Sequence, residues 1–282
     1  MKSVRYSDFM PDFDLSPLPP VLAALRGGLI VSCQAQADEP LFGAGVMARL
    51  AVAARAGGAV GIRANTPVDV RAIRDAVPDL PLIGLFKVVV AGFEDVYITP
   101  RLEDAVAVAE AGADIIAVDA TLRPHPRRNE VSATRLNEVS ATRRNKVSGI
   151  AQNGGSHDTF ISGSAAELIR EVKRVTGQLI MADIATERDA VAAPQAGADV
   201  ISTTLSGYTA DSPALDGPDM DLIRRLAHLH LSIPIIAEGR IHAPEQARAA
   251  LDAGAFAVVV GGAITRPQQI ARRFADALVA RS

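Results

Sequence analysis

The chain of 282 residues is long enough for one large domain or two smaller ones, and 49% of its residues are hydrophobic. That share, together with a mean hydropathy of +0.19, favours a large buried core and argues against disorder. The net charge of −3 gives a nucleic-acid partner no overall electrostatic support.

Cysteine content and the distribution of apolar residues indicate a reducing compartment. Cys33 is the only cysteine, which excludes an internal disulfide and CxxC redox chemistry. No apolar run approaches the roughly 18 residues of a membrane span. Residues 1–20 lack the apolar stretch of a signal peptide. We therefore expect a cytoplasmic protein with no membrane partner.

Short apolar runs alternate with helical segments along the chain. A short apolar run that ends at polar residues is typical of a buried parallel strand. Strands are expected at 29–33, 59–62, 82–86, 114–118, 179–182, 199–203, 234–237 and 256–260. Helices are expected at 18–26, 44–56, 68–77, 102–111, 164–176, 187–196, 219–229, 244–253 and 267–280.

A short glycine signature recurs where a helix gives way to a strand. It reads Ala111-Gly-Ala-Asp114, Ala196-Gly-Ala-Asp199 and Ala253-Gly-Ala-Phe256. A glycine that caps a helix before a tight turn explains this pattern. Eight such strand–helix units predict an α/β fold, a single-domain (β/α)8 TIM barrel. A doubly wound open sheet is the competing fold, but no Gly-x-Gly-x-x-Gly opens the first helix.

One basic, repetitive segment does not fit the strand–helix pattern. Asn129-Glu-Val-Ser-Ala-Thr-Arg135 recurs as Asn137-Glu-Val-Ser-Ala-Thr-Arg143, a period of eight residues. We interpret 127–160 as a loop insertion after the fourth strand and favour a disordered, solvated segment over a basic lid. Residues 1–16 are interpreted as an N-terminal tail, and 17–282 as the barrel domain.

Polar and charged side chains follow most of the expected strands. In a barrel these strand ends meet at one face, which is where active sites lie. The residues at the ends are Gln34, Arg63, Asn65, Lys87, Asp119, Asp183, Thr204, Glu238 and Arg240. Any one of them could serve a structural salt bridge, but burying so many charges without a task is costly.

Lys87 and Glu238 are the candidate acid–base residues. Burial at a strand end lowers the pKa of a lysine, which can then act as a general base or form a Schiff base. Alternatively, Lys87 forms an ion pair with Glu238 or Asp183. Such a pair in the resting protein is compatible with a catalytic role of Lys87.

Two glycines after the last strand suggest a phosphate site. Gly261 and Gly262 expose backbone N–H groups before a helix, and Arg266 adds charge-assisted hydrogen bonds. The five histidines show no metal-ligand spacing, so no metal site is expected.

Motifs at nearly every strand end carry a resemblance to a known family. They are Gly28-Leu-Ile-Val-Ser-Cys-Gln-Ala35, Gly58-Ala-Val-Gly-Ile-Arg-Ala-Asn65, Tyr97-Ile-Thr-Pro100, Ala113-Asp-Ile-Ile-Ala-Val-Asp-Ala-Thr121, Met181-Ala-Asp-Ile184, Thr203-Thr-Leu-Ser-Gly-Tyr-Thr209, Ala237-Glu-Gly-Arg-Ile241 and Val260-Gly-Gly-Ala-Ile-Thr-Arg-Pro267. Over about residues 22–280 the chain resembles the N-acetylmannosamine-6-phosphate 2-epimerases.

The resemblance implies an isomerase with a TIM barrel and no cofactor. Its implied reaction converts N-acetylmannosamine 6-phosphate to N-acetylglucosamine 6-phosphate in sialic acid breakdown. Lys87 resembles the catalytic acid/base and Glu238 its acidic partner. Sugar-binding roles fall to Gln34, Arg63 and Asp183, with Arg240 expected beside them, and phosphate binding to Gly239, Gly261, Gly262 and Arg266. The family loop after Asp119 is shorter than the corresponding segment of this chain. A homodimer is a possible assembly.

Two other functions remain as alternatives. A Schiff-base aldolase would also use Lys87. A non-catalytic phosphosugar sensor would bind the ligand without isomerising it and could contact a partner through the basic repeat.

Overall fold

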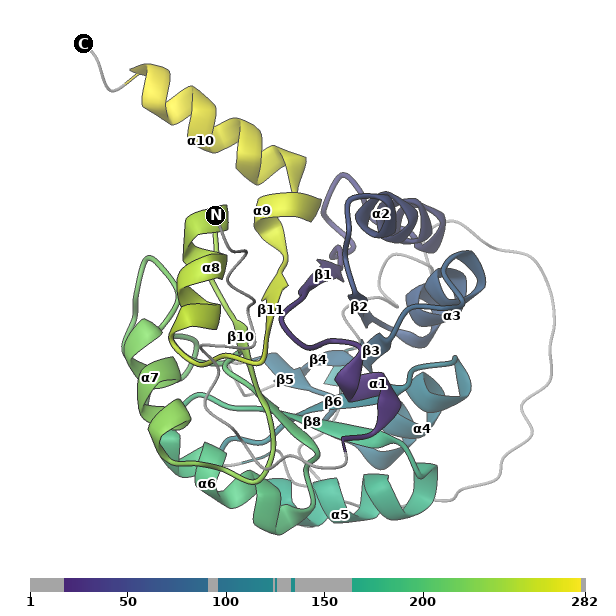
Figure 1. Cartoon of the computed structure of the whole chain (residues 1–282). Coiled ribbons are helices and arrows are strands. Elements are labelled where there is room, and N and C mark those ends of the chain that lie inside the picture. Colours follow the sequence, from purple (N-terminus) through teal and green to yellow (C-terminus); the bar gives the residue numbers. More distant parts are fainter. Residues whose placement is uncertain (1–17, 91–95, 124, 126–132, 135–163, 280–282) are drawn as a thin grey trace, which may run out of the picture.

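Eight parallel strands close into a barrel in the order β1-β11-β10-β9-β8-β6-β3-β2 (Figure 1). This computed structural model describes residues 18–90, 96–123, 125, 133–134 and 164–279. The barrel strands are β1 (Leu29–Cys33), β2 (Gly61–Asn65), β3 (Leu82–Leu85), β6 (Ile115–Asp119), β8 (Leu179–Asp183), β9 (Val200–Ser202), β10 (Ile235–Glu238) and β11 (Ala257–Val260). The predicted TIM barrel is confirmed, and the open sheet is ruled out because β1 pairs with both β2 and β11.

Apolar side chains fill both faces of the barrel wall. Ile30, Ile83 and Ile236 belong to a buried cluster inside the barrel. Ile116 and Ala182 belong to a second cluster, which packs the strands against the surrounding helices. Burial on both faces explains why the strands read as continuous apolar runs in the sequence.

Helices surround the barrel, and the glycine signature caps them as expected. They are α2 (Ala44–Ala56), α3 (Pro67–Ala76), α4 (Leu102–Glu110), α5 (Ala165–Thr176), α6 (Glu187–Ala196), α7 (Met220–His228) and α8 (Pro244–Asp252), followed by α9 (Gly262–Thr265) and α10 (Pro267–Val279). Gly254 follows α8 with a φ of 105°. A Cβ there would lie 2.6 Å from the Cβ of Ala227, so the turn needs glycine on both counts.

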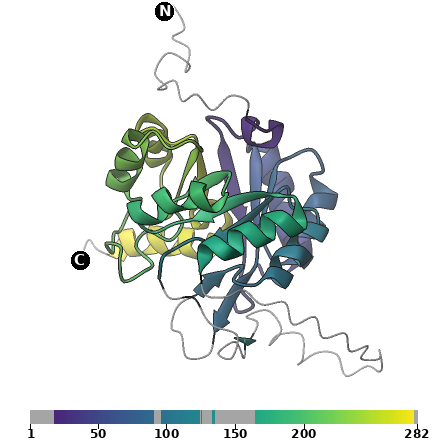
Figure 2. The same cartoon turned by 90° about the horizontal axis from the view of Figure 1, so that it is seen from below.

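A small antiparallel sheet, which the sequence analysis does not anticipate, extends the barrel at one end. β4 (Lys87–Val90) pairs with β5 (Val96–Ile98) and with β7 (Ala133–Thr134). Figure 2 shows this sheet at the opposite end of the barrel from α1 (Pro20–Ala23), whose Leu22 belongs to the inner core cluster. Because β4 begins two residues after β3 ends, the sheet places Lys87 at the carboxyl ends of the strands.

Element boundaries differ from the expected ones by a few residues at most of the strand ends. Arg63 and Asp183, for example, lie within β2 and β8, because strand pairing continues to the polar residues: Asp119 is still in register with Asp183. The tail at 1–16 and nearly all of the insertion at 127–160 lie outside the described residues. Within the insertion, Ala133–Thr134 forms β7.

The last helix extends away from the barrel (Figure 1). None of the residues of α10 is buried, and Phe274 and Leu278 are 71% and 81% exposed. They lie four residues apart, on one face of the helix. Leu29 of β1 and Leu251 of α8 pack at the edge of a core cluster and stay partly exposed. In the part of the chain described here, no helix is long and apolar enough to cross a membrane.

Candidate active site

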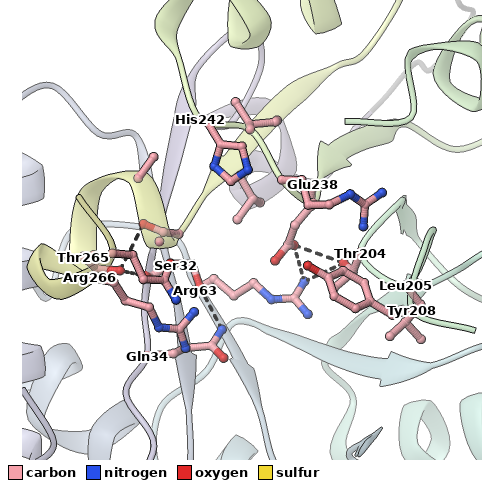
Figure 3. A pocket seen from close by; sticks show the side chains of 18 of the residues that line it. Ser32, Gln34, Arg63, Thr204, Leu205, Tyr208, Glu238, His242, Thr265 and Arg266 are labelled. Carbon is pink, nitrogen blue, oxygen red and sulfur yellow. Dashed lines mark hydrogen bonds and ion pairs between the residues drawn. The ribbon is translucent and has the colours of Figure 1, made fainter. Parts of the chain in front are cut away.

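A cavity of about 540 Å³ opens at the carboxyl ends of the barrel strands (Figure 3). Nine residues predicted for the site line it: Gln34, Arg63, Lys87, Glu238, Gly239, Arg240, Gly261, Gly262 and Arg266. The tenth, Asp183, is fully buried beneath them. The barrel therefore brings together side chains that are up to 232 residues apart in the sequence, from Gln34 to Arg266.

Arg63 lies at the centre of the site, inside the barrel. Its neighbours Ile62 and Ala64 belong to the outer core cluster, so the alternation along β2 turns Arg63 inward. Its side chain is 1% exposed and forms a two-pronged ion pair with Asp183, at 3.0 and 2.6 Å. Arg63 Nη1 also lies 2.9 Å from Glu238 Oε2. Two carboxylates thus offset the cost of burying one guanidinium.

Hydroxyl groups from β9 and the loop after it link the two carboxylates. The Thr204 hydroxyl lies 2.6 Å from Asp183 Oδ1 and 3.1 Å from Glu238 Oε2, and its single proton can go to only one of them. Ser202 Oγ donates to Glu238 Oε2 at 3.3 Å. These contacts hold the carboxylate of Glu238 in one orientation at the cavity wall.

Lys87 is held by its backbone, which leaves its amine facing the cavity. Its N–H donates to Asn65 Oδ1 at 2.9 Å, and Thr99 Oγ1 accepts from the N–H of Phe86 at 2.9 Å. Among the described residues, no ion pair joins Lys87 to Glu238 or Asp183. Burial, reinforced by the charge of Arg63, lowers the pKa of Lys87 to about 8.

The pKa of Glu238 moves in the opposite direction. Burial raises the pKa of Glu238 above its ordinary value, against the opposing charge of Arg63. An amine that loses its proton easily and a carboxyl group that keeps its proton longer therefore line the same cavity. This pairing suits acid–base chemistry near neutral pH.

Two buried polar atoms at the site have no hydrogen-bond partner among the described residues. They are Arg63 Nε and Gln34 Oε1, although Gln34 Nε2 donates to Ser32 Oγ at 2.9 Å. A buried polar atom without a partner is costly, and both atoms belong to side chains that line the cavity.

The far end of the cavity is built from the turn after β11. Gly261 and Gly262 open α9, and Arg266 follows it. Arg266 pairs with Glu39 at 2.6 and 3.1 Å. The pKa of Glu39 is lowered overall. Burial alone would raise it, but the hydrogen bonds from Arg266 and the Gln36 N–H outweigh burial. This end offers glycine backbone and one arginine to an anion.

Arg240, two residues after Glu238, has a left-handed backbone conformation, with a φ of 52°. Its guanidinium donates to two backbone carbonyl oxygens, Ser206 O at 2.7 Å and Gly217 O at 3.0 Å. The Arg240 guanidinium carbon lies 5.0 Å from the centre of the Tyr208 ring. Arg240, predicted to bind substrate, lines the cavity, and its described contacts tie it to the β9–α7 loop.

Several residues that line the cavity were missed by the sequence analysis. They include Ser32, Gln36, Leu205, Tyr208 and His242. Gln36, Leu205, Tyr208 and His242 lie in the loops that follow the strands, where no periodicity marks a position. Asp119, expected at the same face, does not line the cavity; it accepts from Thr121 and Arg123 instead. Among the described residues, no group of three His, Cys, Asp or Glu could hold a metal ion.

Comparisons with known proteins point to one family. The family described as "Putative N-acetylmannosamine-6-phosphate epimerase" matches residues 47–153 and 133–280. Two curated relatives bear the name "Putative N-acetylmannosamine-6-phosphate 2-epimerase". The protein of Caldanaerobacter subterraneus subsp. tengcongensis is 45% identical over 90% of this chain and 92% of its own length. That of Cutibacterium acnes is 42% identical over 92% of this chain and 96% of its own length.

A solved structure supports the same relationship. The N-acetylmannosamine-6-phosphate 2-epimerase of Clostridium perfringens is 38% identical, with a TM-score of 0.74 over 90% of this chain and 95% of that one. The expected resemblance is thus confirmed both in sequence and in fold. The chain belongs to the N-acetylmannosamine-6-phosphate 2-epimerase family.

Proposed function

We propose that the protein is an isomerase that converts N-acetylmannosamine 6-phosphate to N-acetylglucosamine 6-phosphate in the breakdown of sialic acid and other amino sugars. The observation that carries the proposal is the acid–base pair: Lys87, with a pKa of about 8, lines the same cavity as Glu238. The names of the relatives agree with this substrate.

The chemistry follows from the carbon that changes configuration. In the open-chain sugar the C2 proton is acidic because C2 lies next to the C1 aldehyde. The neutral amine of Lys87 takes this proton, and the electron pair moves toward the C1 oxygen to give an enolate. Return of a proton to the opposite face of C2 inverts its configuration. Glu238 assists ring opening or protonates the C1 oxygen. One base could serve both faces, or two bases could share them.

Arg63 supplies the positive charge that the enolate needs. It is preorganised by Asp183 and Glu238, so little reorganisation accompanies the charge that develops on the sugar oxygen. Gln34 and Arg63 both line the cavity, and their side chains offer hydrogen bonds to the sugar. In this proposal Gln34, Arg63, Asp183 and Arg240 bind or position the sugar.

The phosphate binds at the opposite end of the cavity. Gly239, Gly261 and Gly262 bring backbone close to the ligand, and Arg266 offers a charge-assisted hydrogen bond. The reaction as proposed moves only protons and needs no cofactor.

A time course in heavy water tests the reaction directly. Proton NMR of N-acetylmannosamine 6-phosphate in D₂O should show the product form with deuterium at C2. An epimerised product free of deuterium would exclude the proton-transfer route. Lys87→Ala should lose nearly all turnover while it keeps its affinity for inorganic phosphate. Borohydride trapping of a covalent Lys87 adduct would instead favour a Schiff-base aldolase.

The assembly and compartment are also part of the proposal. In this proposal the protein is cytoplasmic and forms a homodimer. The dimer is supported by helix α10, which extends away from the barrel and exposes its apolar residues Phe274 and Leu278. A second copy could cover this face against the partly exposed Leu29 and Leu251. The buried thiol of Cys33, whose pKa burial raises to about 12, suits a reducing compartment without serving a redox role.

A further inference from the structure

Tyr208 is an exposed aromatic residue at the wall of the cavity. It follows Thr204 and Leu205 in the β9–α7 loop, and all three line the cavity. Its side chain is 57% exposed, in a chain in which aromatic residues make up only 4%. Leu205, in contrast, is buried in the inner core cluster. The acid–base mechanism uses neither residue.

Arg240 fixes the loop on both sides of Tyr208. It donates to Ser206 O on one side and to Gly217 O on the other, and it lies over the ring. A Cβ at Gly207 would lie 2.6–2.8 Å from the Arg240 guanidinium, at a φ of 81°. Only glycine allows this close approach. A Tyr208 ring held in this way is a preorganised surface.

Three further hydrogen bonds restrict the same loop. Ser206 Oγ donates to Asp219 Oδ2 at 2.8 Å, and Gly207 N–H donates to Ser212 Oγ at 2.8 Å. Thr203 Oγ1 donates to the carbonyl oxygen of Glu238 at 2.9 Å. The position of Tyr208 is therefore tied to the strand that carries Glu238.

Tyr208 lies on the side of the cavity that carries Glu238, away from Arg266 (Figure 3). In Figure 3, Arg266 and Thr265 lie on one side of Arg63, and Thr204, Leu205 and Tyr208 lie on the other, beside Glu238. A sugar phosphate anchored at Arg266, with its C1 oxygen at Glu238 and the neighbouring C2 within reach of Lys87, would direct the substituent of C2 toward the loop. In the proposed substrate that substituent is a flat acetamide with a methyl group.

We propose that Tyr208 and Leu205 form the subsite for the N-acyl group, and that Arg240 acts on selectivity as a positioning residue through Tyr208. This inference rests on the proposed function and adds which residues read the acyl chain. The aromatic face packs against the flat amide and its methyl group, and the fixed loop limits the length of the acyl chain. Arg240 thus binds the sugar indirectly.

Acyl-chain selectivity tests the subsite. Initial rates of epimerisation would be measured for the N-acetyl, N-propanoyl and N-butanoyl forms of mannosamine 6-phosphate. Tyr208→Ala should lower kcat/KM for the N-acetyl substrate about tenfold, mainly through KM. The ratio of N-butanoyl to N-acetyl kcat/KM should rise about fivefold, because the wall is removed. Tyr208→Phe, which keeps the ring, should stay within about twofold of wild type on every substrate.

Arg240→Ala and Gly207→Ala test the positioning role. Both should raise the N-butanoyl ratio in the same direction as Tyr208→Ala, while kcat for the N-acetyl substrate changes less than KM. A thermal unfolding curve for each variant separates this effect from unfolding. Unchanged selectivity in folded Tyr208→Ala would overturn the subsite, and unchanged selectivity in folded Arg240→Ala would overturn the positioning role.

Failure of the proposed function would look different. Wild-type protein that does not epimerise any of the three substrates would refute the function itself. Wild-type protein that epimerises them, with a Tyr208→Ala variant of equal selectivity, would refute the subsite alone.

Discussion

Arg63 Nη1 lies 2.9 Å from Glu238 Oε2, in a barrel interior where only 1% of the arginine side chain is exposed. The same guanidinium lowers the pKa of both flanking groups, Lys87 and Glu238. The charge of Arg63 thereby favours the neutral amine of Lys87. At Glu238 the effect of burial is larger than that of Arg63, so the pKa of this carboxyl group stays raised. One buried charge thus helps to tune both the base and its acidic partner.

The pH dependence of the reaction should report the pKa of Lys87. The base is the neutral amine, so kcat/KM should rise about tenfold per pH unit on the acidic side and level off near pH 8. The measurement is kcat/KM for N-acetylmannosamine 6-phosphate between pH 5.5 and 9. A profile that is flat between about pH 6 and 8 would contradict the assignment of Lys87 as the base.

Lys87→Met should stabilise the folded chain while it abolishes turnover. The pKa of Lys87 is about 8 in the folded chain, against an ordinary value of 10.5, so its proton costs stability in full below pH 8. This cost disappears as the pH rises toward 10.5. We expect the variant to be about 2 kcal/mol more stable at pH 7 and equal to wild type near pH 10.5. Urea unfolding at both pH values checks this, and equal stability at pH 7 would contradict it.

Asp183→Asn should cost both stability and activity. Asp183 is fully buried and forms the two-pronged pair with Arg63, so its neutralisation leaves a buried guanidinium partly uncompensated. We expect a loss of about 3 kcal/mol in urea unfolding. Asp252→Asn is the matched control, since its pair with Arg248 is exposed, and should change stability by less than about 1 kcal/mol. Equal losses in the two variants would show that burial of the pair does not matter.

Glu39→Gln should strengthen phosphate binding. Glu39 Oε1 accepts a hydrogen bond from Arg266 Nε at 2.6 Å. Its negative charge lies beside the site proposed for a phosphate dianion. Glutamine keeps a hydrogen bond to the arginine and removes that repulsion. Titration calorimetry with inorganic phosphate should give a Kd about threefold lower than wild type. Weaker binding would mean that the charge of Glu39 is needed to orient Arg266.

Phe274→Asp should disrupt the proposed dimer. The side chain lies on the detached helix α10 and is 71% exposed in the single chain. A charge there would be buried unpaired in an interface of two copies. Light scattering coupled to size exclusion should show a dimer for wild type and a shift toward monomer for the variant. Val191→Asp, on an exposed position of α6, is the control and should leave the mass unchanged. A wild-type protein that elutes as a monomer would refute the dimer.

Much of the fold could be predicted because its determinants are local. An apolar run marks each of the eight strands, and the glycine caps at Gly112, Gly197 and Gly254 have the positive φ expected of them. The small sheet was missed because the apolar residues after Lys87 read as a connection. Its partner β7 comes from a segment more than 40 residues further along the chain.

The site was predictable where a strand carries the residue and obscure where a loop does. Arg63 and Glu238 end apolar runs, so their position alone indicates the cavity. Tyr208 and Gln36 lie in loops, where no periodicity separates a lining residue from a solvent-exposed one. The pairing of Arg266 with Glu39 joins residues 227 positions apart, which no local pattern reveals.

The strand β7 has a genetic consequence. It is formed by Ala133–Thr134, which belong to the first of two nearly identical eight-residue units, and it pairs with Val89 and Val90 on the strand that begins at Lys87. The second unit repeats the same dipeptide at 141–142. Replication slippage that removed one unit would therefore leave an equivalent Ala-Thr dipeptide in the remaining copy.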